Sequence, residues 1–329
     1  MKHYRILQVF IIFVLFFGLF QGVLVGQEAE QYYRDREREA PEKIKTQLQT
    51  LRDEIRARNY TFQVGYTRAM DYTIEQLTGL VEPPNLSDLV KEQNLAVEKI
   101  RDKKLLADIV TTCSPTASSW DWRLNNGTTP VRDQGPCGSC WDFATHAPFE
   151  GSYHIINGVI IDSSEQDTLD CNPWGYGCDG GWWAHQYLID VGSATEAAYP
   201  YTAVKGPCQT KPRPYKAVAW GYVSSNPIPT ITELKQALCK YGPLSVAVYV
   251  TPLFQAYTGG VFNACISAPG VNHGVTLIGW ADSKKAWLIE NSWNTTWGES
   301  GYMWIAYNCN KIGYGAAWVR AKKRTTNCD

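Results

Sequence analysis

The stretch 133–143, with the sequence DQGPCGSCWDF, holds the side chains best suited to chemistry. Two cysteines, Cys137 and Cys140, stand three residues apart in a loop rich in Gly and Pro, and a stretch that can form a helix starts near Ser139. A cysteine at a helix N-terminus faces the positive end of the helix dipole, which favours thiolate over thiol. Gln134 adds a side-chain amide donor just upstream. A nucleophile beside hydrogen-bond donors is what acyl transfer needs, because negative charge develops on the carbonyl oxygen in the transition state.

The segment QGPCGSCW resembles the active-site segment of papain-like cysteine proteases. Two further motifs agree with that family: His273 in VNHGVTLIGW and Asn291 in ENSWNTTWGESGY follow Cys140 by roughly 130 and 150 residues, as the family's spacing requires. The resemblance runs from about Trp120 to Trp318. It implies an α+β, papain-like two-lobed fold with a helical lobe at about 120–215, a β-barrel-like lobe at about 216–320 and an active-site cleft between them.

The resemblance assigns a catalytic role to four residues. His273 would accept the thiol proton of Cys140 and return it to the leaving amine, since an imidazole titrates near neutrality. The resting nucleophile would be a thiolate–imidazolium pair. Asn291 would hold the imidazole in the right tautomer and orientation, and Gln134 and the backbone N–H of Cys140 would form the oxyanion hole.

The resemblance also implies where a substrate would bind. Gly180 and Gly181 have no side chains, so an extended peptide could pair with their backbone. The specificity subsite would be lined by Trp182, Val271 and a residue between 314 and 317; because that window holds no acidic residue, we expect a preference for apolar side chains over Arg. Trp293 would cover the histidine–asparagine hydrogen bond, and Trp297 would border the leaving-group side.

The chain has ten cysteines, all after residue 112, which in an exported chain indicates disulfides. By resemblance, Cys137 would pair with Cys178, Cys171 with Cys208, and Cys265 with Cys309. Cys113, Cys239 and Cys328 have no partner in the family; one bridge among them would leave one thiol over.

Length and composition set further bounds. With 329 residues, 44% of them hydrophobic, the chain can bury a sizeable core, and a formal net charge of −1 argues against nucleic acid as the main partner.

Lys2 and Arg5 precede an apolar run from Ile6 to Phe20, which has the layout of a signal peptide covering residues 1–26. An uncleaved signal anchor is the alternative. We expect a secreted or lysosome-like vacuolar location, with no stable membrane association after cleavage, a monomer, and neither cofactor nor metal. Four N-x-[ST] sites, at Asn59, Asn85, Asn126 and Asn294, would matter in a glycosylating host.

Residues 27–116 differ in composition from the rest, because all 13 tryptophans lie at or after Trp120. The apolar residues Ile44, Leu48, Leu51 and Ile55 recur at helical spacing, residues 61–66 alternate like a strand, and a second helical pattern runs from 86 to about 110. The resemblance suggests an inhibitory propeptide. In that family the propeptide helix carries a pattern ending in Ile and Asn four residues apart, which Ile55 and Asn59 match, although most other signature positions differ. The alternative is an independent helical domain or a partner-binding helix. Residues 114–119 are expected to form an exposed linker to the peptidase domain, residues 117–329.

Within that domain, a helix is expected from Cys140 towards Ile156, bent by Pro148. Asp142, which replaces a small residue of the family, should point away from Cys140, since it lies two residues on in a helix. Capping boxes are predicted at Ser163 with Gln166 and at Thr230 with Glu233. Short strands should follow from residue 216 onward, interrupted by a helix at 231–241.

Two other functions remain open for this sequence. Cys137 and Cys140 form a C-x-x-C, the motif of a thiol–disulfide oxidoreductase, but no thioredoxin-like βαβ pattern surrounds it. A catalytically silent secreted binding protein on the same fold is the other alternative. The preferred function is a cysteine endopeptidase made as a zymogen, with polypeptide substrates and its own propeptide as inhibitor, acting through an acyl-thioester on Cys140.

Overall fold

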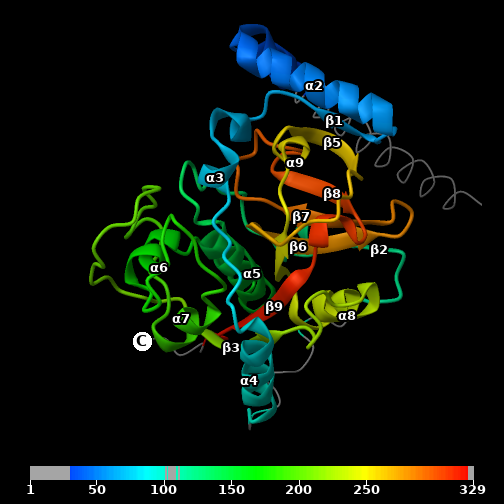
Figure 1. Cartoon of the computed structure of the whole chain (residues 1–329). Helices are drawn as coiled ribbons and strands as arrows, with labels where there is room; N and C mark the ends of the chain where they lie inside the picture. The colour runs from blue at the N-terminus through cyan, green and yellow to red at the C-terminus, as the bar shows by residue number, and fades with distance from the viewer. Residues whose placement is uncertain (1–29, 101, 103–108, 110–111, 325–329) are drawn as a thin grey trace, which may run out of the picture.

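The structure, a computed structural model, describes residues 30–324 except 101, 103–108, 110 and 111 (Figure 1). The predicted signal peptide and Cys328 therefore lie outside the described residues. Within the described part, no helix is both long and apolar enough to cross a lipid bilayer.

The chain combines helices with one large sheet. The helices are α2 (Glu42–Arg58), α3 (Ile74–Leu77), α4 (Leu86–Glu98), α5 (Cys140–Asn157), α6 (Glu165–Cys171), α7 (His185–Asp190), α8 (Ile231–Tyr241) and α9 (Pro252–Gln255), with short 3-10 helices at Arg68–Asp71, Trp122–Leu124 and Cys309–Lys311. The strands are β1 (Phe62–Val64), β2 (Ser119–Asp121), β3 (Ala217–Tyr222), β4 (Leu244–Val248), β5 (Tyr257–Phe262), β6 (His273–Ala281), β7 (Ala286–Glu290), β8 (Tyr302–Ala306) and β9 (Tyr314–Ala321).

Helix α5 lies where the two lobes meet. It packs against β6 and β9 on one side and against α6 on the other, with α7 beyond (Figure 1). The strands follow the order β1-β5-β8-β7-β6-β4-β9-β3, with β2 paired to β6. Among the strands of the described residues, only β5 and β8 run parallel. The α+β arrangement of a helical and a β lobe is thus confirmed, but the sheet also recruits β1 and β2 from outside the predicted β lobe.

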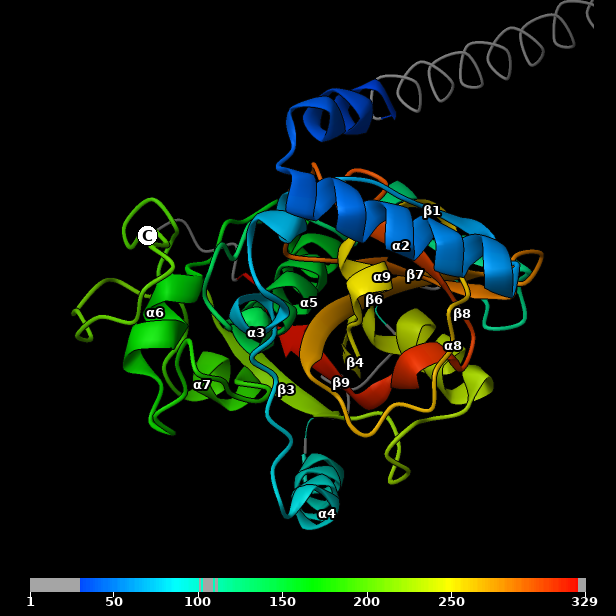
Figure 2. The same ribbon diagram turned by 45° about the horizontal axis from the view of Figure 1, so that its top comes forward.

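The N-terminal segment, residues 30–100, lies across the rest of the chain. Helix α2 begins at Glu42 and buries Leu48 and Leu51, as the apolar spacing predicts, and β1 pairs antiparallel with β5. From α3 the chain runs down over the boundary between α5 and the strands to α4 (Figure 2). Helix α4 ends at Glu98, short of the predicted end near residue 110.

Only the first part of the predicted linker, residues 114–119, differs from the body of the protein, because its last three residues bond to the sheet. Ser119 begins β2, and the Ser118 and Ala117 carbonyls accept hydrogen bonds from the Asp282 N–H and the Trp280 Nε1–H. The linker's last residues therefore belong to the body of the protein.

Helix α5 is continuous over 18 residues although Pro148 lies inside it. A proline cannot donate to the carbonyl four residues earlier, which here belongs to Ala144. Ser245 of β4 donates its hydroxyl to that carbonyl at 2.6 Å. The sheet thus satisfies the acceptor that the proline leaves free, which lets the helix continue to Asn157.

The helix caps follow the predictions with one shift. Thr230 and Glu233 form the predicted capping box of α8. At α6 the cap is Ser164, whose hydroxyl accepts from the Asp167 N–H, and not Ser163 with Gln166. Ser163 instead bonds the buried Glu150 carboxylate, so its hydroxyl is committed elsewhere.

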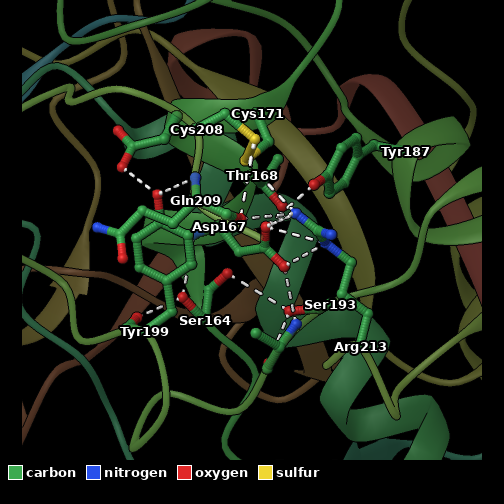
Figure 3. A network of polar contacts seen from close by, with 12 residues as sticks. Ser164, Asp167, Thr168, Cys171, Tyr187, Ser193, Tyr199, Cys208, Gln209 and Arg213 are labelled. Carbon is green, nitrogen blue, oxygen red and sulfur yellow. Dashed lines mark hydrogen bonds and ion pairs between the residues drawn. A yellow bond between two sulfur atoms is a disulfide. The ribbon is translucent and has the colours of Figure 1, made fainter. Parts of the chain in front are cut away.

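A buried polar network secures the outer loop of the helical lobe (Figure 3). Asp167 of α6 accepts two-pronged bonds of 2.8–3.1 Å from the Arg213 guanidinium, together with bonds from Tyr187 Oη and the Ala194 N–H. The Cys171–Cys208 disulfide joins the same loop to α6. An isolated buried carboxylate would be costly, so these partners make its burial possible and pin the loop 195–213.

Four disulfides lie in the described part of the chain. Three are the pairs that the resemblance implied, and the fourth joins Cys113 to Cys239 of α8; the pairs are Cys113–Cys239, Cys137–Cys178, Cys171–Cys208 and Cys265–Cys309.

Candidate active site

Cys140 is the first residue of α5 and is fully buried. It is the free cysteine among the described residues, because Cys137 is bonded to Cys178. The C-x-x-C pair is therefore not a redox couple here. The Cys140 Sγ accepts a hydrogen bond of 3.3 Å from the Gly79 N–H of the N-terminal segment.

His273 begins β6, and Asn291 directly follows β7, its neighbour in the sheet. His273 Nε2 and Asn291 Oδ1 lie 2.8 Å apart. The Trp293 ring lies over the imidazole, with centroids 4.6 Å apart and an interplanar angle of 35°, and Phe254 of α9 meets it edge-on. The imidazole is thus held by one hydrogen bond and by two aromatic rings that exclude water.

Gln134 lies fully buried in the loop before α5. Its Nε2 donates to the Leu77 carbonyl at 3.0 Å and to the Cys137 carbonyl at 2.8 Å. The Ser292 hydroxyl donates to its Oε1 at 2.7 Å, and the Gln134 N–H donates to the Ser292 carbonyl at 2.8 Å. Ser292 therefore fixes which end of the amide points into the site, a role that sequence reasoning missed although the residue adjoins Asn291.

The loop pinned by the buried network reaches this site through Tyr201. The Tyr201 hydroxyl donates to the Gln134 carbonyl at 2.9 Å and lies 2.6 Å from the Ser139 hydroxyl. Its ring meets Phe143 edge-on. The Gln134 backbone is therefore supported from both lobes.

The electrostatics of the covered site oppose an ion pair. Burial raises the pKa of the Cys140 thiol to about 11, although the nearby N–H groups of Gly274, Gly79, Trp141 and Leu80 counteract part of the rise. Burial also lowers the pKa of His273 to about 4, against the effects of the Asn291 side chain and the Leu77 carbonyl. Burial by the N-terminal segment therefore favours a thiol and a neutral imidazole over the expected thiolate–imidazolium pair.

After α3 ends at Leu77, the segment from Thr78 to Glu82 lies in the cleft as an extended chain. Gly181 donates to the Gly79 carbonyl and accepts from the Val81 N–H, both at 2.9 Å, in a parallel bridge, while Leu80 donates to the Asn272 carbonyl at 3.0 Å. A Cβ on Gly181 would lie 2.7 Å from the Trp141 ring. Gly181 therefore pairs with an extended segment along its backbone, whereas the N–H and the carbonyl of Gly180 both bond to Gly177. Gly180 still lies close to the segment, since a Cβ there would be 2.6 Å from Val81 Cγ2.

Leu80 is buried in the predicted specificity subsite. It shares one apolar cluster with Trp182, against which Val271 packs. A Cβ on Gly315 would lie 2.7 Å from the Trp182 ring, which identifies Gly315 as the residue of the 314–317 window beneath the subsite. Trp297, by contrast, is fully buried behind Trp293 and donates its Nε1–H to the Gln255 carbonyl, so in this state it packs and does not line the cleft.

Asp142 points away from Cys140, as its helical position predicts, and is fully buried near His146, with a carboxylate–Nε2 distance of 3.4 Å. Burial raises the Asp142 pKa well above its usual value and lowers that of His146 to about 3. The His146 ring nitrogens lie 2.7 and 2.8 Å from the Ser163 and Thr168 hydroxyls. Burial thus favours the neutral form of both groups, and the pair is a structural feature of the helical lobe.

The structure therefore brings Cys140, His273, Asn291 and Gln134 into one buried site at the lobe boundary. Phe254 of α9 also belongs to its surroundings and was missed in the sequence. A four-residue helix is too short to produce a recognisable apolar period. Among the described residues, no cluster of His, Cys, Asp and Glu is suited to hold a metal ion.

A nucleophilic cysteine at a helix N-terminus, paired with a histidine and an asparagine from a sheet, defines a cysteine protease site of the papain type. Residues 116–320 match the model of the "Papain family cysteine protease" family, and the chain belongs to that family. It is 40% identical over 200 residues to a cathepsin L-like peptidase of Aedes aegypti, covering 57% of this chain and 58% of the relative. A cathepsin L-like proteinase of Fasciola hepatica is 35% identical over 257 residues, covering 75% of this chain and 74% of the relative.

Among solved structures, digestive procathepsin L2 proteinase from the larval midgut of Tenebrio molitor is similar over most of its length. It superimposes with a TM-score of 0.69 at 26% identity, covering 89% of this chain and 93% of that chain. The similarity thus extends to the N-terminal segment.

Proposed function

We propose that the full chain is the inactive precursor of a cysteine endopeptidase and that residues 27–116 are its inhibitory propeptide. The observation that carries this proposal is the occupation of the site by Leu77–Val81. The Leu77 carbonyl accepts a hydrogen bond from the Gln134 Nε2, and the Cys140 Sγ accepts one from the Gly79 N–H. An N–H group is not an electrophile, so the segment blocks the nucleophile without offering it a bond to cleave.

Once the segment is removed, the sulfur and the imidazole become solvated and can exchange the proton. The Cys140 thiolate then attacks the carbonyl carbon of a bound peptide, and Gln134 Nε2 with the Cys140 backbone N–H stabilises the oxyanion. The His273 imidazolium donates its proton to the departing amine, which leaves an acyl-thioester on Cys140. His273 then takes a proton from water, whose oxygen attacks the thioester and releases the acid. Asn291 keeps the imidazole oriented through both steps.

The substrates we propose are polypeptides with an apolar side chain in the subsite that Leu80 fills. Its walls are Trp182 and Val271, and Gly315 lies beneath. A peptide series varied at this position should be cleaved fastest with Leu or Phe. Faster cleavage with Arg would contradict the assignment of the subsite.

We further propose that the enzyme acts as a monomer in a secreted or lysosome-like compartment. The basic residues before the N-terminal apolar run, and four disulfides in the described part, support export. Size-exclusion chromatography of the secreted protein would test the oligomeric state.

Alkylation of Cys140 by an active-site-directed epoxide, before and after acidification, tests the proposed function. Labelling of Cys140 should appear as the N-terminal segment is shed, with peptidase activity rising in parallel. A free Cys140 that stays unreactive in the shortened chain would instead indicate a silent binding protein.

A further inference from the structure

Helix α4 contacts the rest of the chain outside the cleft. Leu86, Val90 and Val97 recur at helical spacing on one face; the first two are buried and the third is half-buried. That face lies against β3, the last strand in the sheet order (Figure 1). The opposite face carries Lys91 and Glu92, which are exposed.

Two amide side chains of α4 bond directly to the backbone of β3. Gln93 Nε2 donates to the Trp220 carbonyl at 2.7 Å, and the Tyr222 N–H donates to Asn94 Oδ1 at 3.1 Å. An edge strand leaves such groups without a neighbouring strand. The two amides of α4 thus occupy the place of a further strand.

The strand is shaped for this close approach, and it adjoins the cleft. A Cβ on Gly221 would lie 3.0 Å from Val97 Cγ2, so a larger residue there would press on the helix. The next residue, Tyr222, accepts a hydrogen bond of 3.0 Å from the Nε1–H of Trp182 in the specificity subsite. The surface under α4 is therefore continuous with that subsite.

The connection between the cleft and α4 is short. Only residues 81–85 separate Leu80, in the subsite, from Leu86 at the start of the helix. Val81 is bonded to Gly181, and Pro83 and Pro84 restrict the backbone that follows. Holding α4 on β3 therefore restrains the segment that covers Cys140.

We propose that the outward edge of β3, from Trp220 to Tyr222, is an exosite for α4. It is a second binding surface, outside the catalytic cleft, that holds the N-terminal segment in place and slows the exposure of Cys140. This inference rests on the proposed inhibitory role of that segment.

The test uses the full, uncleaved chain and two double variants. Gln93→Ala/Asn94→Ala removes both bonds to β3, and Lys91→Ala/Glu92→Ala, on the exposed face of the same helix, is the matched control. The rate of Cys140 alkylation by a small epoxide at neutral pH and the hydrogen exchange of the Tyr222 amide are measured on each. For two lost hydrogen bonds we expect alkylation about tenfold faster in the first variant, with faster exchange at Tyr222 and no change in the control.

Two outcomes would overturn the inference, and they are distinguishable. If the wild-type chain is alkylated slowly and Gln93→Ala/Asn94→Ala equally slowly, the exosite is refuted and the inhibitory role stands. If the uncleaved wild type is alkylated as fast as the cleaved enzyme, the inhibitory role itself fails, and the exosite fails with it.

Discussion

Replacing Gln134 by Ala tests the oxyanion hole directly. The Nε2 of this fully buried side chain holds a carbonyl oxygen at 3.0 Å, and Ser292 fixes its other end at 2.7 Å, so the donor is oriented before substrate arrives. Loss of one preorganised oxyanion donor costs about 10²–10³ in kcat, or ~2.7–4 kcal/mol. Because this donor stabilises charge that develops in the transition state, we expect kcat of the cleaved enzyme to fall by that factor and KM to change little.

Gln255→Ala is the matched control. Gln255 is also a buried glutamine whose Nε2 donates to two carbonyls, each at 2.8 Å, but these belong to Ala69 and Tyr72 of the N-terminal segment. Once the segment is gone, the substitution should leave kcat unchanged. The test compares kcat and KM of both cleaved variants with those of the wild type by steady-state kinetics, and thermal melting confirms that each variant is folded. A folded Gln134→Ala enzyme within about threefold of wild-type kcat, or an equal loss in Gln255→Ala, would refute the reasoning.

Three further predictions concern the uncleaved chain. Because burial raises the pKa of Cys140 to about 11, its thiolate fraction, and hence its alkylation by iodoacetamide, should grow about tenfold per pH unit between roughly pH 7 and 10; after cleavage the rate should be high and nearly flat. Gly79→Ala places a Cβ 1.7 Å from the Gly138 carbonyl oxygen, and since overpacking costs about 1–3 kcal/mol, it should speed epoxide labelling roughly 5- to 150-fold. Unchanged labelling would contradict the described path of the segment. Arg68→Ala removes a 2.8 Å ion pair with Asp133 that is partly exposed and worth up to ~1 kcal/mol, so labelling should accelerate at most about fivefold; a difference that persists in 1 M salt would rule out the ion pair as its cause.

The residues proposed as catalytic, which the structure brings together, were all suggested by the sequence because each sits in a contiguous motif. Cys140, His273 and Asn291 start or follow regular elements, and the strands around them alternate clearly. The state of the pair could not be predicted in the same way. Its pKa values depend on burial by Leu77–Val81, a segment whose path through the cleft no local pattern encodes.

Other features depend on contacts between distant residues. Strand β5 carries Gly259 and Gly260 and has weak strand propensity, and it forms between β1 and β8. The partner of Cys113 is set by where the chain crosses α8, which spacing does not reveal. The sequence favours Ser163 as the cap, because Gln166 stands three residues on, and only the hydrogen bond from Ser163 to the buried Glu150 leaves the cap to Ser164.

The Cys113–Cys239 bridge has a topological consequence for maturation. A backbone cut before Cys113 yields two separate polypeptides, and the new N-terminus stays fastened to α8. A cut between Cys113 and Cys239, including one at the composition boundary near residue 116, only opens a covalent ring. The two pieces would then remain one molecule under non-reducing conditions, and the inhibitory part would stay at high local concentration beside the cleft. Complete liberation of the enzyme therefore requires a cut upstream of Cys113 or reduction of this bridge.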